Sequence, residues 1–280
     1  FIYFSGGVTT VGCPISCTFN GQSAVYRASL GANGNVTSVF SSVNQTSLPT
    51  ALFNHNMLVN NNKVYILGGA NCSGIASLCT PGTNNTQYAD VYMSTLDASG
   101  NIGVWSRIGG LTTANSAMSA VLYGGIIYAV GGYSNGSNRN VMQYAKLQSD
   151  GTLVSDFVAD SRSIPRDTIL IGMAVIKGFI YLLGGSDQSA AYSSVYFAPL
   201  STSGATSGAY ISGPNLLTPR GLAGFAQYGD SIYLAGGCAT ADFGGCPGTT
   251  NQLNTTETIQ INTVGTGRPT ALSTTTGEPS

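Results

Sequence analysis

The chain has 280 residues and a formal net charge of −1, from 10 basic and 11 acidic residues that are scattered singly. Only 8% of the residues are charged and 42% are hydrophobic, which excludes a basic surface that follows nucleic-acid phosphates and excludes disorder through low hydrophobicity. The longest apolar stretch, around residues 172–185, is interrupted by Lys177. It is shorter than the roughly 20 apolar residues that cross a bilayer, so no membrane insertion is expected.

One short phrase of hydrophobic residues, which ends in two glycines, recurs five times along the chain. Its copies read FIYFSGG, KVYILGG, IIYAVGG, FIYLLGG and SIYLAGG. The glycine pairs begin at Gly6, Gly68, Gly131, Gly184 and Gly236. Repetition at so regular a spacing indicates a repeat architecture. Because β-branched and aromatic residues favour strands and glycine frees the backbone, each copy predicts a buried strand that stops at its glycine pair.

Further strand signals flank each phrase. Downstream of it, a second predicted strand ends in a turn with glycine, as in SAVYRASLGANG and ADVYMSTLDASG. In the first four repeats an aromatic residue follows this turn and predicts a last strand; these residues are Phe40, Trp105, Phe157 and Tyr210. The fifth repeat lacks the aromatic, so its last strand has the weakest signal. Upstream of four phrases, NMLVNNN, SAVLYGG, GMAVIKG and AGFAQYGD predict a first strand with a tight turn.

The predicted repeat unit is a sheet of four short antiparallel strands, called a to d from the centre outward. One such sheet cannot bury both of its faces, so the units are expected to stack as the blades of an all-β β-propeller. A two-sheet sandwich would explain the alternation of residues but not the regular repetition. We assign residues 1–272 to the propeller and 273–280 to a Thr/Ser-rich tail or linker.

The first blade lacks its innermost strand, because Phe1 already lies in strand b. Five blades are therefore visible with one strand too few, and the ring is larger if residues precede Phe1. We expect strand a of this blade to come from an upstream segment, from the tail or from a neighbouring molecule. The last case would allow self-association through the incomplete blade.

The repeated pattern resembles the kelch repeat over nearly the whole chain. A glycine pair after a hydrophobic strand, then a Val-Tyr strand and an aromatic residue, carries the resemblance, and it looks like that of secreted bacterial kelch proteins. His55 looks like the histidine of the first kelch strand, and Pro49, Pro165–Arg166 and Pro219–Arg220 look like the Pro/Arg link between blades. Some kelch-like propellers are copper oxidases that use two histidines, whereas His55 is the single histidine of this chain. No metal and no cofactor are therefore expected.

All six cysteines fall as pairs in the three long loops between strands b and c. The pairs are Cys13 with Cys17, Cys72 with Cys79, and Cys238 with Cys246. This segregation predicts three disulfides within loops and an oxidising compartment. Zinc is the rival interpretation, but the three pairs lie in separate blades without nearby histidines.

The long b–c loops of blades 1, 2 and 5 would form one ledge if blade 5 closes onto blade 1. Aromatic and amide side chains there suit a glycan or a protein, and the candidate ligand-binding residues are Phe19, Asn20, Asn71, Tyr88 and Phe243. Phe19 and Phe243 could instead pack beneath their own loops. Candidate N-glycosylation sites in Asn-x-Ser/Thr sequences are Asn35, Asn44, Asn84, Asn135 and Asn254.

The sequence favours an extracellular binding or structural module, secreted or attached to the cell surface, over an enzyme. Its support is the low charge, the stapled loops and the scarcity of titratable groups. The alternative is an extracellular carbohydrate-active enzyme that uses two carboxylates at the propeller axis. The aspartates considered for that role are Asp90, Asp97, Asp150, Asp187 and Asp242.

Overall fold

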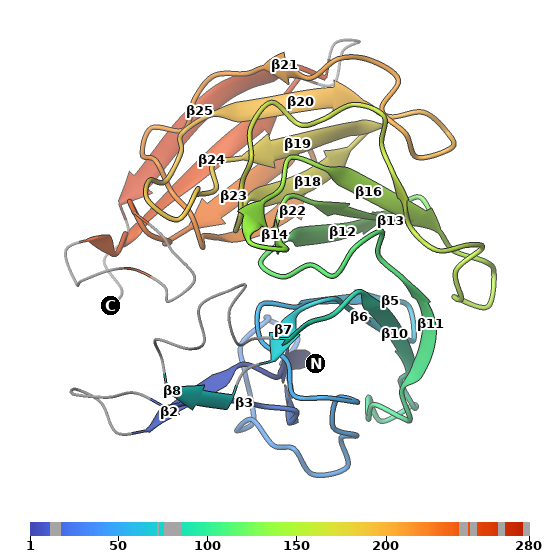
Figure 1. Cartoon of the computed structure of the whole chain (residues 1–280). Helices are drawn as coiled ribbons and strands as arrows, with labels where there is room; N and C mark the ends of the chain where they lie inside the picture. The colour runs from blue at the N-terminus through green and yellow to red at the C-terminus, as the bar shows by residue number, and fades with distance from the viewer. Residues whose placement is uncertain are drawn as a thin grey trace. The chain divides into compact units, whose positions relative to one another are not determined.

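The computed structural model describes residues 1–11, 18–71, 73–75, 86–240, 246, 251–262 and 267–276, and its regular elements there are β-strands (Figure 1). These residues contain no helix that is long and apolar enough to cross a membrane. The chain divides into two compact units. Unit 1 comprises Phe1–Ser116, Ser134–Gly136 and Leu147–Phe157. Unit 2 comprises Ala117–Tyr133, Ser137–Lys146 and Val158–Ser280.

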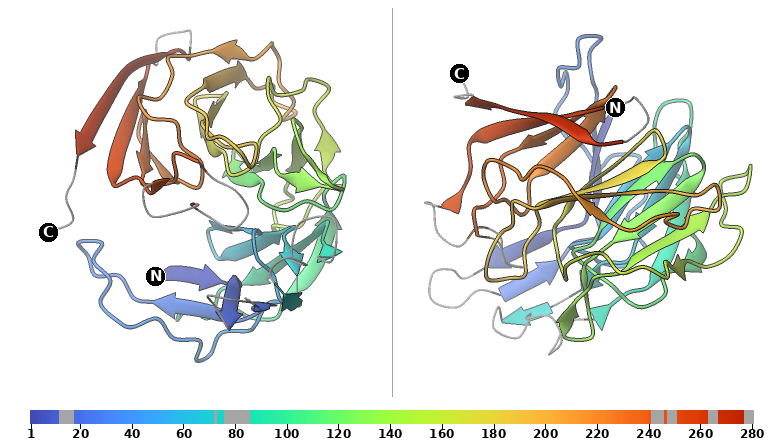
Figure 2. Two further views of the ribbon diagram at one scale, coloured as in Figure 1. Left: turned by 60° about the vertical axis from the view of Figure 1, so that its left-hand side comes forward. Right: turned by 90° about the horizontal axis from the view of Figure 1, so that it is seen from above.

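Unit 2 contains three four-stranded antiparallel sheets, which are blades 3, 4 and 5. Blade 3 consists of β12 (Ser119–Tyr123), β13 (Ile126–Val130), β16 (Met142–Lys146) and β17 (Val158–Ala159). Blade 4 consists of β18 (Gly172–Ile176), β19 (Phe179–Leu183), β20 (Val195–Pro199) and β21 (Ile211–Ser212). Blade 5 consists of β22 (Gly224–Tyr228), β23 (Ser231–Ala235), β24 (Thr255–Ile261) and β25 (Pro269–Thr276). In each sheet the spatial order follows the chain, as Figure 2 also shows.

Unit 1 contains blade 2 and the smaller blade 1. Blade 2 is a four-stranded sheet of β5 (Asn56–Asn60), β6 (Lys63–Leu67), β10 (Asp90–Thr95) and β11 (Ser106–Gly110). Blade 1 is a two-stranded sheet of β1 (Ile2–Ser5) and β4 (Val25–Ala28). Short strands in the b–c loops complete the chain; they are β2 (Val8–Val11), β3 (Thr18–Gly21), β7 (Ala70–Asn71), β8 (Ser73–Ile75), β9 (Thr86–Gln87), β14 (Tyr133–Ser134) and β15 (Ser137–Asn138).

The predicted strands a, b and c are confirmed in blades 2 to 5, and strands b and c are confirmed in blade 1. Strand d differs from the prediction at both ends of the chain. In blade 1 the segment around Phe40 forms a single bridge, Arg27 to Ser41, and its apolar side chain Val39 remains exposed. In blade 5 the segment with the weakest signal forms the longest strand, β25, which continues past residue 272 to Thr276. Its many threonines are β-branched and suit a strand that pairs along β24.

The missing inner strand of blade 1 is not supplied by any part of the chain that the structure describes. In those residues β1 pairs with β4 alone. Of the three sources considered for the missing strand, the upstream segment and the neighbouring molecule stay predictions. The tail instead pairs with β24 as the outer strand of blade 5.

The glycine pairs make the connection from each strand b to the following link between blades. In blade 4, Gly184 and Gly185 have φ angles of 64° and 92°, which side chains rarely adopt. The N–H of Gly185 donates to the carbonyl of Arg220 at 2.9 Å, and a Cβ on Gly184 would lie 2.5 Å from that same oxygen. The pair is therefore required for the backbone to approach the next link.

Each strand b has two faces, which we define by the tyrosine that the strand contains. The leading face is the side on which the tyrosine lies, and the trailing face is the side on which the residues before and after the tyrosine lie. In unit 2, Tyr181 of the leading face of blade 4 packs with Ile232 and Leu234 of the trailing face of blade 5. In unit 1, Tyr3 packs in the same way with Val64 and Ile66. Within each unit, successive blades are thus joined by the burial of a leading face on a trailing face.

Candidate functional site

The b–c loops of blades 1 and 2 join in one small sheet within unit 1. Its strands are β2, β3 and β8, and we call it the loop sheet (Figure 1). Strand β3 comes from blade 1 and pairs with β8 of blade 2 through Thr18 and Ile75, and through Asn20 and Ser73. Loops from two blades therefore form a single surface that contributes nothing to the main sheets.

Two of the predicted ligand-binding residues lie on or beside the loop sheet. Asn20 is exposed in β3, and its carbonyl accepts a hydrogen bond from Gln22 at 3.0 Å. Asn71 lies beside the same strand, since a Cβ on Gly21 would be 2.5 Å from its Oδ1 atom. The structure thus brings Asn20 and Asn71 into one region, and their contact with a ligand stays a prediction.

The structure does not place the three aromatic candidates on the loop sheet as it does the two asparagines. Tyr88 is half-buried and packs against the core of unit 1, and its N–H donates to the carbonyl of Gly69 at 3.0 Å. It anchors the end of its loop, and its contact with a ligand stays a prediction. The side chain of Phe19 and the whole of Phe243 lie outside the described residues.

One of the three predicted disulfides lies in the described residues and is present. Cys238 and Cys246 are bonded within the b–c loop of blade 5, with their Cα atoms 5.3 Å apart. The pairs Cys13–Cys17 and Cys72–Cys79 lie outside the described residues and stay predictions. Among the five candidate glycosylation sites, the four asparagines that the structure describes are exposed; they are Asn35, Asn44, Asn135 and Asn254. Asn84 also lies outside the described residues.

An arginine stacked on a tyrosine lies beside the b–c loop of blade 4 in unit 2. The guanidinium carbon of the exposed Arg166 is 3.8 Å from the ring centroid of Tyr192. Hydrogen bonds from the Tyr192 hydroxyl and from Ser189 hold the pKa of Asp187 well below its usual range. The tyrosine thus meets a carboxylate through its hydroxyl and a guanidinium through its ring, and the guanidinium remains exposed.

The second Pro-Arg pair has a different role, which the sequence pattern did not reveal. Arg220 and Glu257 form a fully buried ion pair at 2.5 Å. Glu257 also accepts the backbone N–H groups of Leu217 and Thr218, so it fastens the link between blades to β24. The carbonyl of Arg220 accepts the N–H of Gly185, and the matching acceptor one blade earlier is Thr168. The two Pro-Arg pairs are therefore two residues out of register.

His55 forms a contact between blades 1 and 2. Its Nε2 atom is 2.8 Å from the hydroxyl of Ser5, and burial lowers its pKa to about 4. Its Nδ1 atom has no hydrogen-bond partner among the described residues. A Ser-His pair of this kind lacks the third group that orients the base of a hydrolase. The arrangement fits a neutral structural histidine.

The aspartates considered for a carbohydrate-active site each have a local partner where the structure describes them. Asp90 pairs with Arg107 at 2.5 Å. Asp97 and Asp150 sit in c–d turns, and hydrogen bonds within those turns lower the pKa of both carboxyls. Asp187 is held by Tyr192 as described above, and Asp242 lies outside the described residues. Across the described part of the chain, no three His, Cys, Asp or Glu side chains gather as metal ligands.

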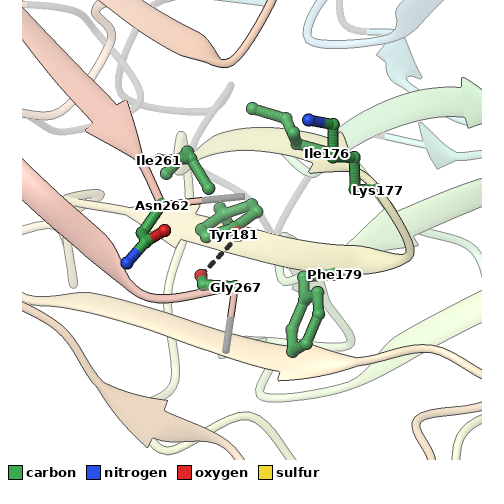
Figure 3. Close-up of a pocket in the computed structure, with 7 residues that line it drawn as sticks. All are labelled: Ile176, Lys177, Phe179, Tyr181, Ile261, Asn262 and Gly267. Atoms are coloured by element: carbon green, nitrogen blue, oxygen red, sulfur yellow. Dashed lines mark hydrogen bonds between the residues drawn. The ribbon is translucent and has the colours of Figure 1, made fainter. Parts of the chain in front are cut away.

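A cavity of about 150 Å³ opens in the seam between blades 4 and 5 (Figure 3). Its walls are Ile176, Lys177, Phe179, Tyr181, Ile261, Asn262 and Gly267. The Tyr181 hydroxyl does not face the cavity as a free group, because it donates to the carbonyl of Gly267 at 2.6 Å. Burial raises the pKa of Tyr181, which keeps the hydroxyl protonated as a donor. The tyrosine hydroxyl in the wall of this cavity thus serves the joint between blades.

No protein-family model matches the chain. A stretch of 94 residues, 33% of the chain, is 33% identical to Kelch-like ECH-associated protein 1B of Danio rerio and covers 16% of that protein's length. The solved structure of YjhT matches 98% of this chain and 80% of its own, with a TM-score of 0.67 and 12% sequence identity. The repeats, the four-stranded sheets and these similarities show that the chain is a kelch-type β-propeller.

Proposed function

We propose that the chain is an extracellular protein-binding propeller that contacts its partner through the b–c loop face. The observation that carries the proposal is the loop sheet, in which loops of blades 1 and 2 pair with each other through β3 and β8. Loops that pair outside the main sheets on a rigid scaffold are typical of binding surfaces. The sequence of its three strands contains no charged residue, so the partner is a polar protein surface and not a nucleic acid.

The extracellular assignment rests on the composition of the chain and on its disulfide, and does not depend on the fold. Only 8% of the residues are charged, and the b–c loop of blade 5 contains the Cys238–Cys246 disulfide. Disulfides persist in oxidising compartments and are rare where thiols are kept reduced. The exposed sequon asparagines, such as Asn135 and Asn254, are compatible with a secreted protein.

In unit 2 the stacked Arg166 adds a specific recognition element to the b–c face. Its guanidinium is exposed and lies flat on Tyr192, so it presents donors in the fork geometry that matches a carboxylate. A partner that carries an Asp or Glu side chain, or a chain carboxylate, among neutral polar groups would suit this site.

A displayed peptide library and a glycan array, both probed with the labelled chain, test this proposal. We expect enriched peptides whose binding is lost with Asn20→Arg in the loop sheet, and acidic members among them whose binding is weakened by Arg166→Ala. Ser155→Arg, in an exposed c–d segment, is the matched control and leaves binding unchanged. Binding that survives Asn20→Arg would place the site elsewhere, and glycan binding without peptide binding would contradict a protein partner.

A further inference from the structure

The tyrosine of strand b makes the same hydrogen bond in three of the repeats. Its hydroxyl donates to the carbonyl of the glycine in a c–d turn that packs against it. The three pairs are Tyr3 with Gly100 at 2.7 Å and Tyr65 with Gly151 at 3.1 Å in unit 1, and Tyr181 with Gly267 at 2.6 Å in unit 2 (Figure 3). In these repeats the hydroxyl is already used within the protein.

Tyr128, the strand-b tyrosine of blade 3, departs from this pattern. It is only 2% exposed, yet in the part of the chain that the structure describes it has a ring contact with Tyr144 and no hydrogen bond. Gly204 is the equivalent turn glycine, and a Cβ on it would lie 2.6 Å from the Tyr144 ring. The turn therefore packs on that neighbouring ring. Burial raises the pKa of Tyr128 to about 12, so its hydroxyl stays protonated and can donate.

A cavity of about 310 Å³ lies beside Tyr128 in the seam between blades 3 and 4, within unit 2. It takes the place that the cavity of about 150 Å³ takes in the next seam. Leu200 in its wall matches Ile261 there, since each donates its N–H to the residue before the following strand b. Ligand-binding pockets begin at about 300 Å³, so the larger cavity reaches that size and the smaller one does not.

The mouths of the two cavities differ by an ion pair. In the seam between blades 4 and 5, Lys177 of one a–b turn binds Asp230 of the next at 3.1 Å. The same turn positions in the seam between blades 3 and 4 are Gly124 and Gly178. Among the described residues, no atom lies within 4 Å of the place that a Cβ on either glycine would take. The larger cavity is thus open where the smaller one is bridged.

The chemistry of the larger cavity is neutral and rich in hydroxyls. The side chains in its walls are Tyr123, Ile126, Tyr128, Leu200, Ser201 and Thr202. A charged ligand would lose water there without meeting a counter-ion in these walls. A purely apolar ligand would leave the Tyr128 hydroxyl unpaired, which is costly for a buried group. The walls therefore suit an uncharged ring that has apolar faces and hydroxyl groups at its edge.

We infer that this cavity binds one neutral hexose unit, with the sugar ring beside Tyr123 and a sugar oxygen that accepts a hydrogen bond from Tyr128. Aromatic rings supply apolar surface with a polar tip, and hydroxyls such as that of Thr202 both donate and accept, as sugar hydroxyls do. The volume admits a single ring. This site is separate from the loop sheet and does not rest on the function proposed above.

Titration of the whole chain with D-glucose, D-galactose and D-mannose, followed by ligand-detected NMR, tests the inference. We expect at least one hexose to bind, and Tyr128→Phe to weaken its binding by about tenfold, because the ring stays and the donor is lost. Gly124→Lys places at this mouth the lysine of the neighbouring seam and is expected to weaken binding as well. Lys177 has a φ of 48° and Gly124 a φ of 58°, so the turn accepts a lysine.

Asn20→Arg, in the loop sheet, is the matched control and is expected to leave hexose binding unchanged. Circular dichroism verifies that each variant is folded. Without sugar, Tyr128→Phe should lower the free energy of unfolding less than Tyr181→Phe does, because the Tyr128 hydroxyl has no acceptor among the described residues. With sugar, the unfolding midpoint of the wild type should rise more than that of Tyr128→Phe.

The inference is overturned if none of the three hexoses binds the folded wild type, or if Tyr128→Phe or Gly124→Lys leaves hexose binding unchanged. An equal loss of stability in Tyr128→Phe and Tyr181→Phe would also overturn it, since the hydroxyl would then be bonded within the protein. The probe p-cresol stands for a tyrosine side chain of a partner. Binding of p-cresol without binding of any hexose would assign the cavity to a peptide and contradict a sugar site.

Discussion

The seam between blades 4 and 5 and the seam between blades 1 and 2 use the same tyrosine-to-glycine contact in different surroundings. In the first, Tyr181 is fully buried, and the buried Arg220–Glu257 pair lies in the same blade joint. In the second, Tyr3 is half-buried, and polar side chains at the surface support the turn. This joint is thus fully buried in the seam between blades 4 and 5, which we call the dry seam, and partly exposed in the seam between blades 1 and 2, which we call the hydrated seam.

The support of the turn in unit 1 comes from Arg27. Its guanidinium donates to the carbonyl of Ser99 and to Asn101 Oδ1, the latter at 2.9 Å, and lies 4.4 Å from the ring centroid of Phe1. These groups are accessible to water, which can replace a lost contact. The comparison therefore predicts that the free energy of this repeated hydrogen bond depends on whether water can reach its acceptor.

The largest effect is expected from the dry seam. Arg220→Ala removes one partner of a buried ion pair and leaves the Glu257 carboxylate charged and uncompensated. Breaking such a pair costs about 3–5 kcal/mol, so the midpoint of denaturant unfolding should fall strongly. Arg107→Ala is the control, because its ion pair with Asp90 is at the surface and its loss should barely move the midpoint. Equal effects of the two substitutions would show that the seam is not dry.

The second prediction concerns the ionisable group in the seam between blades 1 and 2. Burial lowers the pKa of His55 to about 4 in the folded chain, against about 6.5 when unfolded. Below pH 6.5 the unfolded chain binds a proton that the folded chain does not, so stability falls until about pH 4 and then levels off. The loss over this window is about 3 kcal/mol.

Urea unfolding at a series of pH values measures this loss. His55→Gln removes the titrating group and should flatten the profile between pH 6.5 and 4. The carboxyls of Asp97 and Asp187, whose pKa values are lowered in the fold, contribute their own loss of stability at lower pH. A profile that is the same in the variant and in the wild type would mean that His55 is not responsible.

The third prediction isolates the repeated hydrogen bond in the dry seam. Tyr181→Phe keeps the ring but removes the donor, so the carbonyl of Gly267 loses its hydrogen bond where the ring is fully buried. An unsatisfied buried acceptor costs about 1–3 kcal/mol. Denaturant unfolding measures the difference, and Tyr196→Phe, a half-buried tyrosine of the same blade outside this contact, is the control. If Tyr181→Phe lowers the free energy of unfolding no more than Tyr196→Phe does, the hydrogen bond does not stabilise the contact between the blades.

The strands of the five phrases could be predicted because their signal is local. A run such as FIYLLGG holds both the residues that favour a strand and the glycines that end it. Strand β25 could not be predicted in the same way, since a Thr-rich segment becomes a strand there through pairing with β24. The loss of strand d in blade 1 is likewise not encoded locally, because Phe40 matches the pattern of the other repeats.

The features of the candidate site that could be predicted are those that follow from loop length and residue type. The long loops and the Cys238–Cys246 pair could be identified along the chain, and so could Asn20 and Asn71. The different roles of Arg166 and Arg220 could not, because both follow a proline and the two-residue offset appears only in the hydrogen bonds of the links. The tyrosines and turn glycines were visible as repeated residues, but their contact between blades exists only in three dimensions.

The smallest effect on stability is expected in the seam between blades 1 and 2, and it is compared with the effect in the seam between blades 4 and 5. Tyr3→Phe removes the same hydrogen bond as Tyr181→Phe, here to the carbonyl of Gly100. Tyr3 is half-buried, although Gly100 itself is buried, so we expect water to enter beside the ring and the net loss to stay below about 1 kcal/mol. Unfolding of both variants under one set of conditions gives the ratio that matters. A loss at Tyr3 that equals the loss at Tyr181 would show that solvent access does not set the strength of this contact, and that the turn geometry alone does.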